Sequence, residues 1–462
     1  TGVQTCALPI CLCEEVSENY KQSESLHTFV EWALEGAEIS LHDLDAVSLG
    51  MGPGSYTGLR IGSSAAKGFC YGLKIPLIAV NSMETMIEPF LSREFDFVIP
   101  LLDARRMEVY TAVFNGKTGE MLSATEAKIL DETSFQEFKD KKVVSFGEIM
   151  LRLEPDGYTR FLQADTFGAT YGGGEANVAV SLANYGFDAK YVTRLPNHEI
   201  GQCAINSLRK YGVDTSYIAR GGDRIGIYYL EKGASQRPSK VIYDRAGSSI
   251  YTATSADFNW DEIFKDCAWF HITGITPALC DNVAELTIEA CKKAKEHGVK
   301  ISCDLNYRNK LWSKEKAGEV MAKICEYVDV CIANEEDAAD VFGIKASDTD
   351  VTSGEVNREG YKEVASELTK RFGFEKVAIT LRESINANIN NWSAMLYDGK
   401  DYYFSKRYNM QIVDRVGGGD SFGAGLIAAS LEGYDPQATI EFAVAASCLK
   451  HSVEGDFNMV SM

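Results

Sequence analysis

The order of apolar stretches after about residue 142 most strongly constrains the fold. Four short strand-like runs, near residues 268–275, 300–304, 328–333 and 376–381, are separated by stretches with helical spacing. This alternation predicts an α/β fold, a mainly parallel sheet flanked by helices. Ligands of such sheets bind beyond the carboxyl ends of the strands. We therefore expect the functional side chains at those strand ends.

A glycine run near the end of the chain is typical of an anion-binding turn. Gly417, Gly418 and Gly419 precede Asp420, which opens an apolar stretch of small residues. Glycine N–H groups can converge on an anion at a helix N-terminus, where the helix dipole favours negative charge. In this interpretation Asp420 takes the proton of a substrate hydroxyl as its oxygen attacks phosphorus. A helix N-cap aspartate after a glycine turn explains the motif alone equally well.

Composition excludes several classes of protein. The net charge of -20 opposes binding to nucleic acid or to an anionic membrane surface. The 12 cysteines form no CxxC pair and have no metal-ligand spacing with the 6 histidines, as expected for reduced thiols of a cytoplasmic protein. No apolar stretch is long enough to span a bilayer. The 462 residues suffice for about two to three domains.

Two longer motifs accompany the glycine run. Residues 143–153 read Val-Val-Ser-Phe-Gly-Glu-Ile-Met-Leu-Arg-Leu, and residues 172–179 read Gly-Gly-Gly-Glu-Ala-Asn-Val-Ala. With them, residues 142–460 resemble the PfkB-type carbohydrate kinases and, within that family, the 2-dehydro-3-deoxygluconate kinases. The resemblance implies a ribokinase-like fold and ATP-dependent phosphorylation of the 6-hydroxyl of a keto-deoxy sugar acid. It implies the role of general base for Asp420 and an anion hole formed by Gly417, Gly418 and Gly419.

Recognition of a sugar acid requires a fixed cation, and the bidentate fork of arginine suits a carboxylate. Arg245 and Arg308 match positions that contact the acid in the 2-dehydro-3-deoxygluconate kinases. The resemblance implies further sugar contacts from Gly172, Gly173, Gly174, Asn177, Tyr228 and Tyr243, with Asp456 closing the site. A surface or lid-packing role is the alternative for any one of these arginines or tyrosines.

A small β lid is expected over the sugar. Residues 225–231 and 240–244 alternate in the manner of strands, and we expect them to form the lid, which covers about 225–245, together with the region 153–170. Lid edges can pair between subunits, so a homo-oligomer is plausible.

The nucleotide and metal residues rest on the resemblance as well. It implies ATP and Mg²⁺, with Asn306, Asn334, Thr380, Arg382, Ser384, Gly417 and Gly419 on the nucleotide side. The run 334–337 resembles the family's Asn-x-x-Glu motif, which organises the metal through water. Its fourth position is Asp337, one methylene shorter than Glu, which weakens the expected coupling to Mg²⁺. Asp414 lies where related kinases hold a monovalent cation, and a turn-capping aspartate is the alternative.

Residues 14–141 resemble a different family. A helical stretch at 24–36, strands at 45–51 and 75–80, a glycine-rich turn at 52–62 before a helix at 63–73, and a hairpin of 97–103 with 108–114 are expected. The turn lacks the Gly-Lys-Ser/Thr of a P-loop, so it predicts no NTP site. The string resembles the middle of TsaB, a partner subunit in bacterial synthesis of tRNA threonylcarbamoyladenosine. The resemblance implies an incomplete actin-like, Hsp70-like ATPase fold.

The start of the chain and the junction predict a chimera. Residues 1–10 back-translate into a widely used sequencing-library adapter, so we expect no fold for residues 1–13. No Pro/Gly/Ser-rich linker separates residues 14–141 from the kinase-like residues 142–462. Two alternatives stay open: a kinase of a neutral sugar such as fructose or ribose, and a tRNA-modification partner module that carries the kinase as a passenger.

Overall fold

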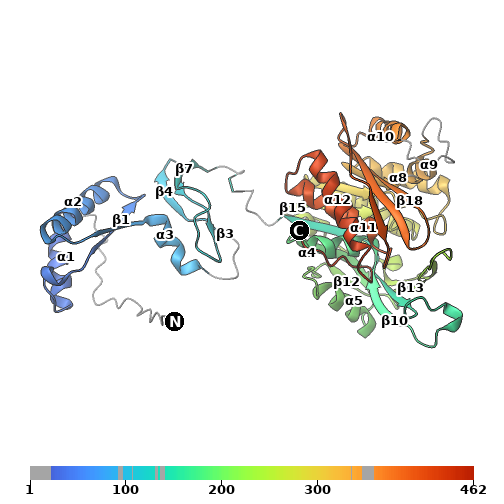
Figure 1. The fold of residues 1–462 in the computed structure, drawn as a ribbon, viewed down its shortest axis with the longest axis horizontal. Helices are drawn as coiled ribbons and strands as arrows, with labels where there is room; N and C mark the ends of the chain where they lie inside the picture. Colours follow the sequence, from blue (N-terminus) through green and yellow to red (C-terminus); the bar gives the residue numbers. More distant parts are fainter. Residues whose placement is uncertain are drawn as a thin grey trace. The chain divides into compact units, whose positions relative to one another are not determined.

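The computed structural model describes residues 22–91, 97–106, 108–130, 134–135, 141–334, 336–345 and 358–462. The expectation for residues 1–13 therefore lies outside the described residues. The chain divides into two compact units, residues 1–139 and 140–462 (Figure 1), and each is described by itself. This division lies close to the predicted junction at residue 142.

The first unit begins with alternating helices and parallel strands. Strands β1 and β2 pair in parallel, and helix α2 connects them. The elements are α1 (Gln22–Gly36), η1 (Leu41–Asp43), β1 (Val47–Gly52), α2 (Tyr56–Leu73), β2 (Leu77–Asn81), α3 (Ser82–Ile87) and η2 (Glu88–Phe90).

The predicted start of the second helix was wrong. Helix α2 begins at Tyr56 rather than at residue 63, because Ser55 caps it by accepting a hydrogen bond from the backbone N–H of Gly58 at 3.4 Å. The tight turn needs only the residues before Ser55, where Gly52 has a φ of +97°.

Short antiparallel strands complete the first unit. Strands β4, β5 and β7 form one sheet and β3 pairs with β6, so the predicted hairpin of 97–103 with 108–114 is divided between two sheets. Their bounds are β3 (Phe97–Val98), β4 (Leu101–Arg105), β5 (Glu108–Thr111), β6 (Phe114–Asn115) and β7 (Glu126–Ile129). A small core packs Met83 and Ile87 of α3 against Ala112 and Phe114.

The second unit is built on one large sheet. Its strand order is β12-β11-β8-β15-β16-β17-β18-β19-β20, and β21 also pairs with β19. Pairing is parallel from β12 to β18 and antiparallel beyond, which confirms the predicted mainly parallel sheet. The bounds are β8 (Lys142–Phe146), β11 (Asp188–Leu195), β12 (Ile218–Arg220), β15 (Cys267–Thr273), β16 (Lys300–Asp304), β17 (Val330–Asn334), β18 (Lys376–Ser384), β19 (Ile389–Tyr397), β20 (Tyr402–Phe404) and β21 (Tyr408–Gln411).

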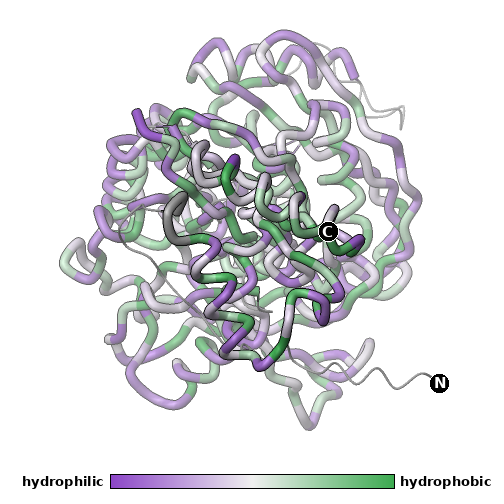
Figure 2. The backbone as a smooth tube through the Cα atoms, turned by 90° about the vertical axis from the view of Figure 1, so that its left-hand side faces the viewer, coloured by the Kyte–Doolittle hydropathy of each residue, from purple (hydrophilic) through white to green (hydrophobic). Residues whose placement is uncertain are grey.

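Helices flank this sheet and form separate cores with it. The larger core includes residues of α6, α7, α8, α9 and α10, and a second core includes residues of α4, α11 and α12. The bounds are α4 (Gly174–Asn184), α5 (Glu199–Arg209), η5 (Ser249–Thr252), η6 (Ser255–Asp257), α6 (Trp260–Phe264), α7 (Asp281–Glu296), α8 (Lys314–Cys325), α9 (Asp337–Phe342), α10 (Arg358–Phe372), α11 (Gly418–Leu431) and α12 (Pro436–Lys450). Hydrophilic and hydrophobic segments alternate at short intervals along the chain (Figure 2), as expected for elements with one buried face.

Helix α11 is an exception, because it is apolar nearly all round and lies beside α12 (Figure 1). A Cβ atom added at Gly425 would lie 2.9 Å from the Cα of Ala443 on α12, so a glycine is needed for this close approach. The start of α11, which carries Asp420, is thereby fixed against the body of the unit.

A separate four-stranded sheet in the order β10-β9-β13-β14 contains the segments predicted to form the lid, and we call it the lid sheet, or lid (Figure 1). Its strands are β9 (Met150–Glu154), β10 (Gly168–Gly172), β13 (Gly226–Glu231) and β14 (Lys240–Asp244), with η4 (Phe161–Gln163) between β9 and β10. The motif 143–153 therefore spans two strands, β8 of the large sheet and β9 of the lid. A Cβ atom at Gly147 would lie 2.2 Å from Oε2 of Glu175, so the chain turns where only glycine fits.

None of the helices in the described ranges has the length and apolar character that a membrane span requires.

Candidate active site

The predicted anion turn lies at the start of α11. Gly417 has a φ of +80°, and an added Cβ atom would lie 2.2 Å from the backbone oxygen of Asp456. A Cβ atom at Gly418 would lie 2.3 Å from the His451 ring, whereas one at Gly419 would have no neighbour within 4 Å. The first N–H groups of a helix have no intrahelical acceptor. The space beside Gly419 at the N-terminus of α11 is therefore not filled by neighbouring atoms.

Asp420 lies in the first turn of α11. A hydrogen bond joins it to the motif of residues 172–179, which we call the sugar loop. Its Oδ2 accepts a 2.6 Å hydrogen bond from Nδ2 of Asn177 on α4. Oδ1 of Asn177 in turn accepts a 3.3 Å hydrogen bond from the backbone N–H of Gly173. Burial raises the pKa of Asp420 to about 6, against the effect of the Asn177 hydrogen bond, which lowers it. A carboxylate with such a pKa is ionised at neutral pH and basic enough to accept a proton.

Gly172 and Gly173 are packed so closely that a side chain would meet a neighbouring atom, whereas Gly174 has ordinary contacts. A Cβ atom at Gly172 would lie 2.0 Å from Oδ2 of Asp456, and one at Gly173 would lie 2.0 Å from the backbone oxygen of Glu148. A Cβ atom at Gly174 would lie 3.6 Å from Oδ1 of Asp420. The loop therefore runs directly beside the candidate base.

The first turn of α4 also carries a buried carboxyl group that the sequence did not single out. Oε1 of Glu175 accepts hydrogen bonds from the Thr273 hydroxyl at 2.8 Å and the Thr276 hydroxyl at 2.7 Å. Burial raises the pKa of Glu175 to about 7. Glu175 ties the sugar loop to the end of β15.

Asp456 is buried in a charged network. Its Oδ1 accepts a 2.7 Å hydrogen bond from Nη1 of Arg152 on β9, and the Tyr228 hydroxyl on β13 contacts both of its oxygens at 2.7 and 2.6 Å. Tyr243 on β14 lies opposite Tyr228 in the lid, with ring centroids 6.2 Å apart, and is 41% exposed. Asp456 therefore connects the lid sheet to the segment that follows α12. Tyr243 is the more accessible of the two tyrosines.

The two arginines predicted to bind the acid differ in their surroundings. Arg245 is buried, and its Nε donates a 2.8 Å hydrogen bond to Oε2 of Glu148, which its Nη2 also contacts. Arg308 is exposed and takes part in none of the ion pairs found among the described residues. Its Nη1 donates only to the backbone oxygen of Tyr307, at 3.1 Å.

Asn334 and Asp337 form a hydrogen-bonded cap at the end of β17. Oδ1 of Asn334 accepts from the backbone N–H of Asp337 at 3.0 Å, and Oδ2 of Asp337 accepts from the backbone N–H of Asn334 at 3.1 Å. Oδ1 of Asp337 accepts from the backbone N–H of Tyr307 at 3.0 Å. Asn306, with a φ of +37°, lies between this cap and β16. The shorter side chain of Asp337 is thus held against the backbone.

A further carboxyl group lies close to this cap. Burial raises the pKa of Asp304 well above its usual range, and the charges of Asp337 and Asp420 raise it further. Asp304 ends β16, one of the strand ends at which we expected function.

The predicted nucleotide residues of β18 lie in its second half, which begins beside the end of β17. Thr380 pairs with Asn334 in register and is buried, whereas Arg382 and Ser384 further along β18 are exposed. Burial lowers the pKa of Arg415, and the nearby positive charge of Arg382 lowers it further. Asn334 and Thr380 therefore lie side by side on β17 and β18, and Arg382 follows two positions further along β18.

Asp414, the candidate for a monovalent cation, is also buried. Its Oδ2 accepts from Nη2 of Arg152 at 2.5 Å and from the backbone N–H of Gly455 at 3.1 Å, and its Oδ1 accepts from the backbone N–H of Val416 at 3.1 Å. The structure thus supports the alternative role, an aspartate that caps a turn, in combination with an ion pair.

Sequence reasoning missed Arg152, Glu148 and Lys450. Arg152 and Lys450 are 0% exposed. A charged residue within the apolar run Met-Leu-Arg-Leu was the one available signal for Arg152, since a buried charge needs a partner. Nothing in the sequence identifies that partner.

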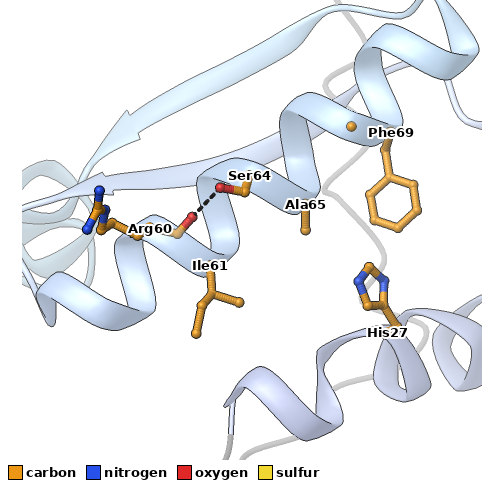
Figure 3. Close-up of a pocket in the computed structure, with 7 residues that line it drawn as sticks. His27, Arg60, Ile61, Ser64, Ala65 and Phe69 are labelled. Atoms are coloured by element: carbon orange, nitrogen blue, oxygen red, sulfur yellow. Dashed lines mark hydrogen bonds between the residues drawn. The ribbon is translucent and has the colours of Figure 1, made fainter.

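A groove in the first unit lies between α1 and α2 (Figure 3). In it the rings of His27 and Phe69 meet edge to face, with centroids 6.0 Å apart. Ser64 Oγ donates a hydrogen bond to the backbone oxygen of Arg60 in its own helix. None of the predicted site residues lies there.

Comparisons with known proteins assign both parts of the chain. Residues 140–461 match the model of the pfkB family carbohydrate kinases, and residues 14–141 match that of tRNA N6-adenosine threonylcarbamoyltransferase. Both matches confirm the predicted relationships, including the link of the first segment to threonylcarbamoyladenosine synthesis.

Individual relatives match the second unit. A crystal structure of 2-dehydro-3-deoxygluconokinase from Thermotoga maritima is 54% identical, with a TM-score of 0.67, and the match covers 70% of this chain and 96% of that chain. A 2-dehydro-3-deoxygalactonokinase from Haloferax volcanii is 33% identical over 69% of this chain and 94% of the relative. A 2-dehydro-3-deoxygluconokinase from Bacillus subtilis is 28% identical over 68% of this chain and 91% of the relative. The chain therefore belongs to the pfkB family of carbohydrate kinases, phosphotransferases with an alcohol group as acceptor.

Proposed function

We propose that residues 142–462 transfer the γ-phosphoryl group of ATP to the 6-hydroxyl of 2-dehydro-3-deoxy-D-gluconate. The observation that carries this proposal is the 2.6 Å hydrogen bond between Asn177 and Asp420, which joins the glycine-rich sugar loop to the anion turn. In this proposal a sugar hydroxyl bound at that loop lies within reach of the base, and the turn of Gly417 to Gly419 receives the phosphate. The N–H group of Gly418 also donates to the backbone oxygen of Arg415, at 3.5 Å.

Asp420 acts as the general base in this mechanism. Its pKa of about 6 leaves it ionised at neutral pH, so it accepts the hydroxyl proton as the O–P bond forms. Phosphoryl transfer depends mainly on positioning and on charge stabilisation. The open N-terminus of α11 supplies the second of these to the developing negative charge.

Asn334 and Asp337 would hold Mg²⁺ carried by ATP through water. Within the described ranges no group of three or more His, Cys, Asp or Glu residues could hold a metal ion. In this proposal the ATP phosphates and water would supply most of the Mg²⁺ ligands. Each Asp337 oxygen accepts one backbone N–H and keeps a lone pair for a bridging water. When bound, Mg²⁺ offsets the phosphate charge.

Arg308 is our candidate for the carboxylate of the sugar acid. Its exposed guanidinium pairs with none of the described carboxylates, whereas the charge of Arg245 is balanced by Glu148. The Thermotoga relative is named for the gluconate compound and the Haloferax relative for the galactonate compound. Both compounds therefore belong in the substrate test.

A neutral sugar such as fructose or ribose is the second candidate. The pairing of Arg245 with Glu148 favours it, because one of the two predicted cations is not free for an acid. Against the passenger alternative, the second unit covers 94% of its Haloferax relative and keeps the lid, the sugar loop and the anion turn.

The lid also has edges suited to pairing with a second copy. Strands β10 and β14 lie at the ends of the lid sheet, and Ile242 and Tyr243 of β14 are 45% and 41% exposed. A homo-oligomer through this edge predicts that Ile242→Lys lowers the mass measured by light scattering.

The test of the proposed function is ATP-dependent phosphorylation by the full chain of the gluconate compound, with the galactonate compound, fructose and ribose in parallel. We expect kcat/KM for at least one sugar acid to exceed that for either neutral sugar by about 100-fold, the contribution of a charged hydrogen bond. Equal or higher values for fructose or ribose would favour the neutral-sugar candidate instead.

A further inference from the structure

We infer that Arg152 is a built-in cation that replaces a bound monovalent cation beside the anion turn and couples the lid to that turn. The family resemblance implied a monovalent-cation site at Asp414, with a turn-capping aspartate as the alternative. The inference rests on the proposed kinase function for its catalytic readout and has a binding readout that does not.

The first support is the place of Arg152 in a network of carboxylates. Its Nη2 lies 2.5 Å from Oδ2 of Asp414 and 2.5 Å from Oε2 of Glu154, and its Nη1 lies 2.7 Å from Oδ1 of Asp456. The side chains of Arg152, Asp414 and Asp456 are 0%, 1% and 2% exposed. Water is largely excluded, so the positive charge of Arg152 is the main compensation for these two acids.

The second support is that the surroundings of Asp414 do not fit a metal cation. Its carboxylate accepts the N–H groups of Val416 and Gly455 in addition to the guanidinium. A cation needs oxygen ligands, whereas the groups that point at Asp414 are donors. Nearby, Nζ of the buried Lys450 donates a 3.1 Å hydrogen bond to the backbone oxygen of Val453. A carbonyl that could serve a cation is thus already bound by an ammonium group.

The third support is the link between this network and the glycine turn. Asp414 lies just before the turn, and the backbone oxygen of Asp456 fills the space that a side chain at Gly417 would need. Arg152 holds both acids from β9, a strand of the lid. Tyr228 of the neighbouring strand β13 reaches the same Asp456. Through these contacts the lid strands and the anion turn are held in one arrangement, and Arg152 is a positioning residue.

The direct test needs no substitution. The thermal midpoint and the kcat of the full chain are measured in KCl, NaCl and choline chloride at equal ionic strength. A cation that binds only the folded state would raise the thermal midpoint. Because the inference leaves no site for such a cation, we expect equal values in the three salts. A rise in the midpoint or in kcat that is specific to K⁺ or Na⁺ would overturn the inference.

A variant then tests the role of the charge. Arg152→Met keeps an apolar side chain and removes the positive charge. We expect kcat to fall by about 100-fold, because a small displacement of the catalytic turn lowers the rate by about that factor. Guanidinium ion, or K⁺, at concentrations too low to denature the chain should restore part of kcat in this variant. The same salts should leave Arg194→Met unaffected, since Arg194 is ion-paired to Asp257 away from this network.

The outcomes separate the possible failures. Loss of activity with no rescue, in a variant whose circular dichroism is unchanged, would overturn the cation role. If Arg152→Met does not fold, the salt comparison on the unaltered chain decides. If the chain phosphorylates none of the four sugars, the proposed function fails, while the salt dependence of the thermal midpoint still tests the built-in cation.

Discussion

The Nδ2 atom of Asn177 lies 2.6 Å from Oδ2 of Asp420, although 243 positions separate the two residues in the chain. Each residue opens a helix, α4 or α11, that follows a glycine-rich stretch. The contact brings the sugar loop and the anion turn together, and it fixes the direction of the carboxylate that we assign as the base. The two helices lie in the same apolar core, so the relationship does not depend on one hydrogen bond alone.

The pH dependence of kcat should report the ionisation of Asp420. Burial raises its pKa to about 6, and the base works only when deprotonated. We therefore expect kcat to be constant above about pH 7 and to fall tenfold per pH unit well below pH 6. Steady-state rates at saturating ATP and sugar between pH 4.5 and 8.5 check this. A pH-independent kcat down to pH 4.5 would contradict it.

Removal of the Asn177 side chain should move that acidic limb. The hydrogen bond from Asn177 lowers the pKa of Asp420, so Asn177→Ala is expected to shift the limb to higher pH. We also expect kcat at pH 8 to fall, since the carboxylate loses its orientation. The matched control is Asn206→Ala on α5, where the Asn206 side chain accepts a hydrogen bond from Gln202 of its own helix. A limb at the same pH in both variants would argue against the contact.

Substrate selectivity should depend on Arg308. Replacing it by alanine is expected to raise KM for the sugar acid by about 10- to 100-fold, the loss of a charged hydrogen bond, without changing KM for fructose. Initial rates over a range of sugar concentrations measure both values. Lys310→Ala, a neighbouring exposed cation, serves as the control for a change in local charge. Parallel changes in KM for acid and neutral sugars would exclude recognition of the carboxylate by Arg308.

The second unit should work without the first. Its large cores, the lid and every predicted kinase residue lie within residues 140–462. A chain that begins at Lys141 is expected to fold and to keep the kcat and KM of the full chain. Circular dichroism and the phosphorylation assay test both points. Loss of activity in a folded shorter chain would show that residues 1–140 contribute to catalysis.

The sequence predicted the elements with a strong local signal. The alternation of strands and helices predicted the parallel sheet, and the glycine run placed Asp420 in the first turn of a helix. It did not predict that the motif 143–153 divides between two sheets, because that break depends on Glu175 packing against Gly147. It also missed Arg152, whose partners Asp414 and Asp456 are 262 and 304 positions away. Ion pairs between such distant positions leave no periodicity or spacing that one sequence can show.

The role of Asp420 is the central claim, and the most direct test is single-turnover phosphoryl transfer from ATP to 2-dehydro-3-deoxy-D-gluconate by the unaltered chain and by Asp420→Asn. The substitution keeps the size of the side chain and removes the base. We predict a rate lower by about 100- to 10,000-fold, the usual contribution of a general base, with ATP affinity and thermal midpoint nearly unchanged. A rate for Asp420→Asn within a few-fold of the unaltered chain would contradict the account.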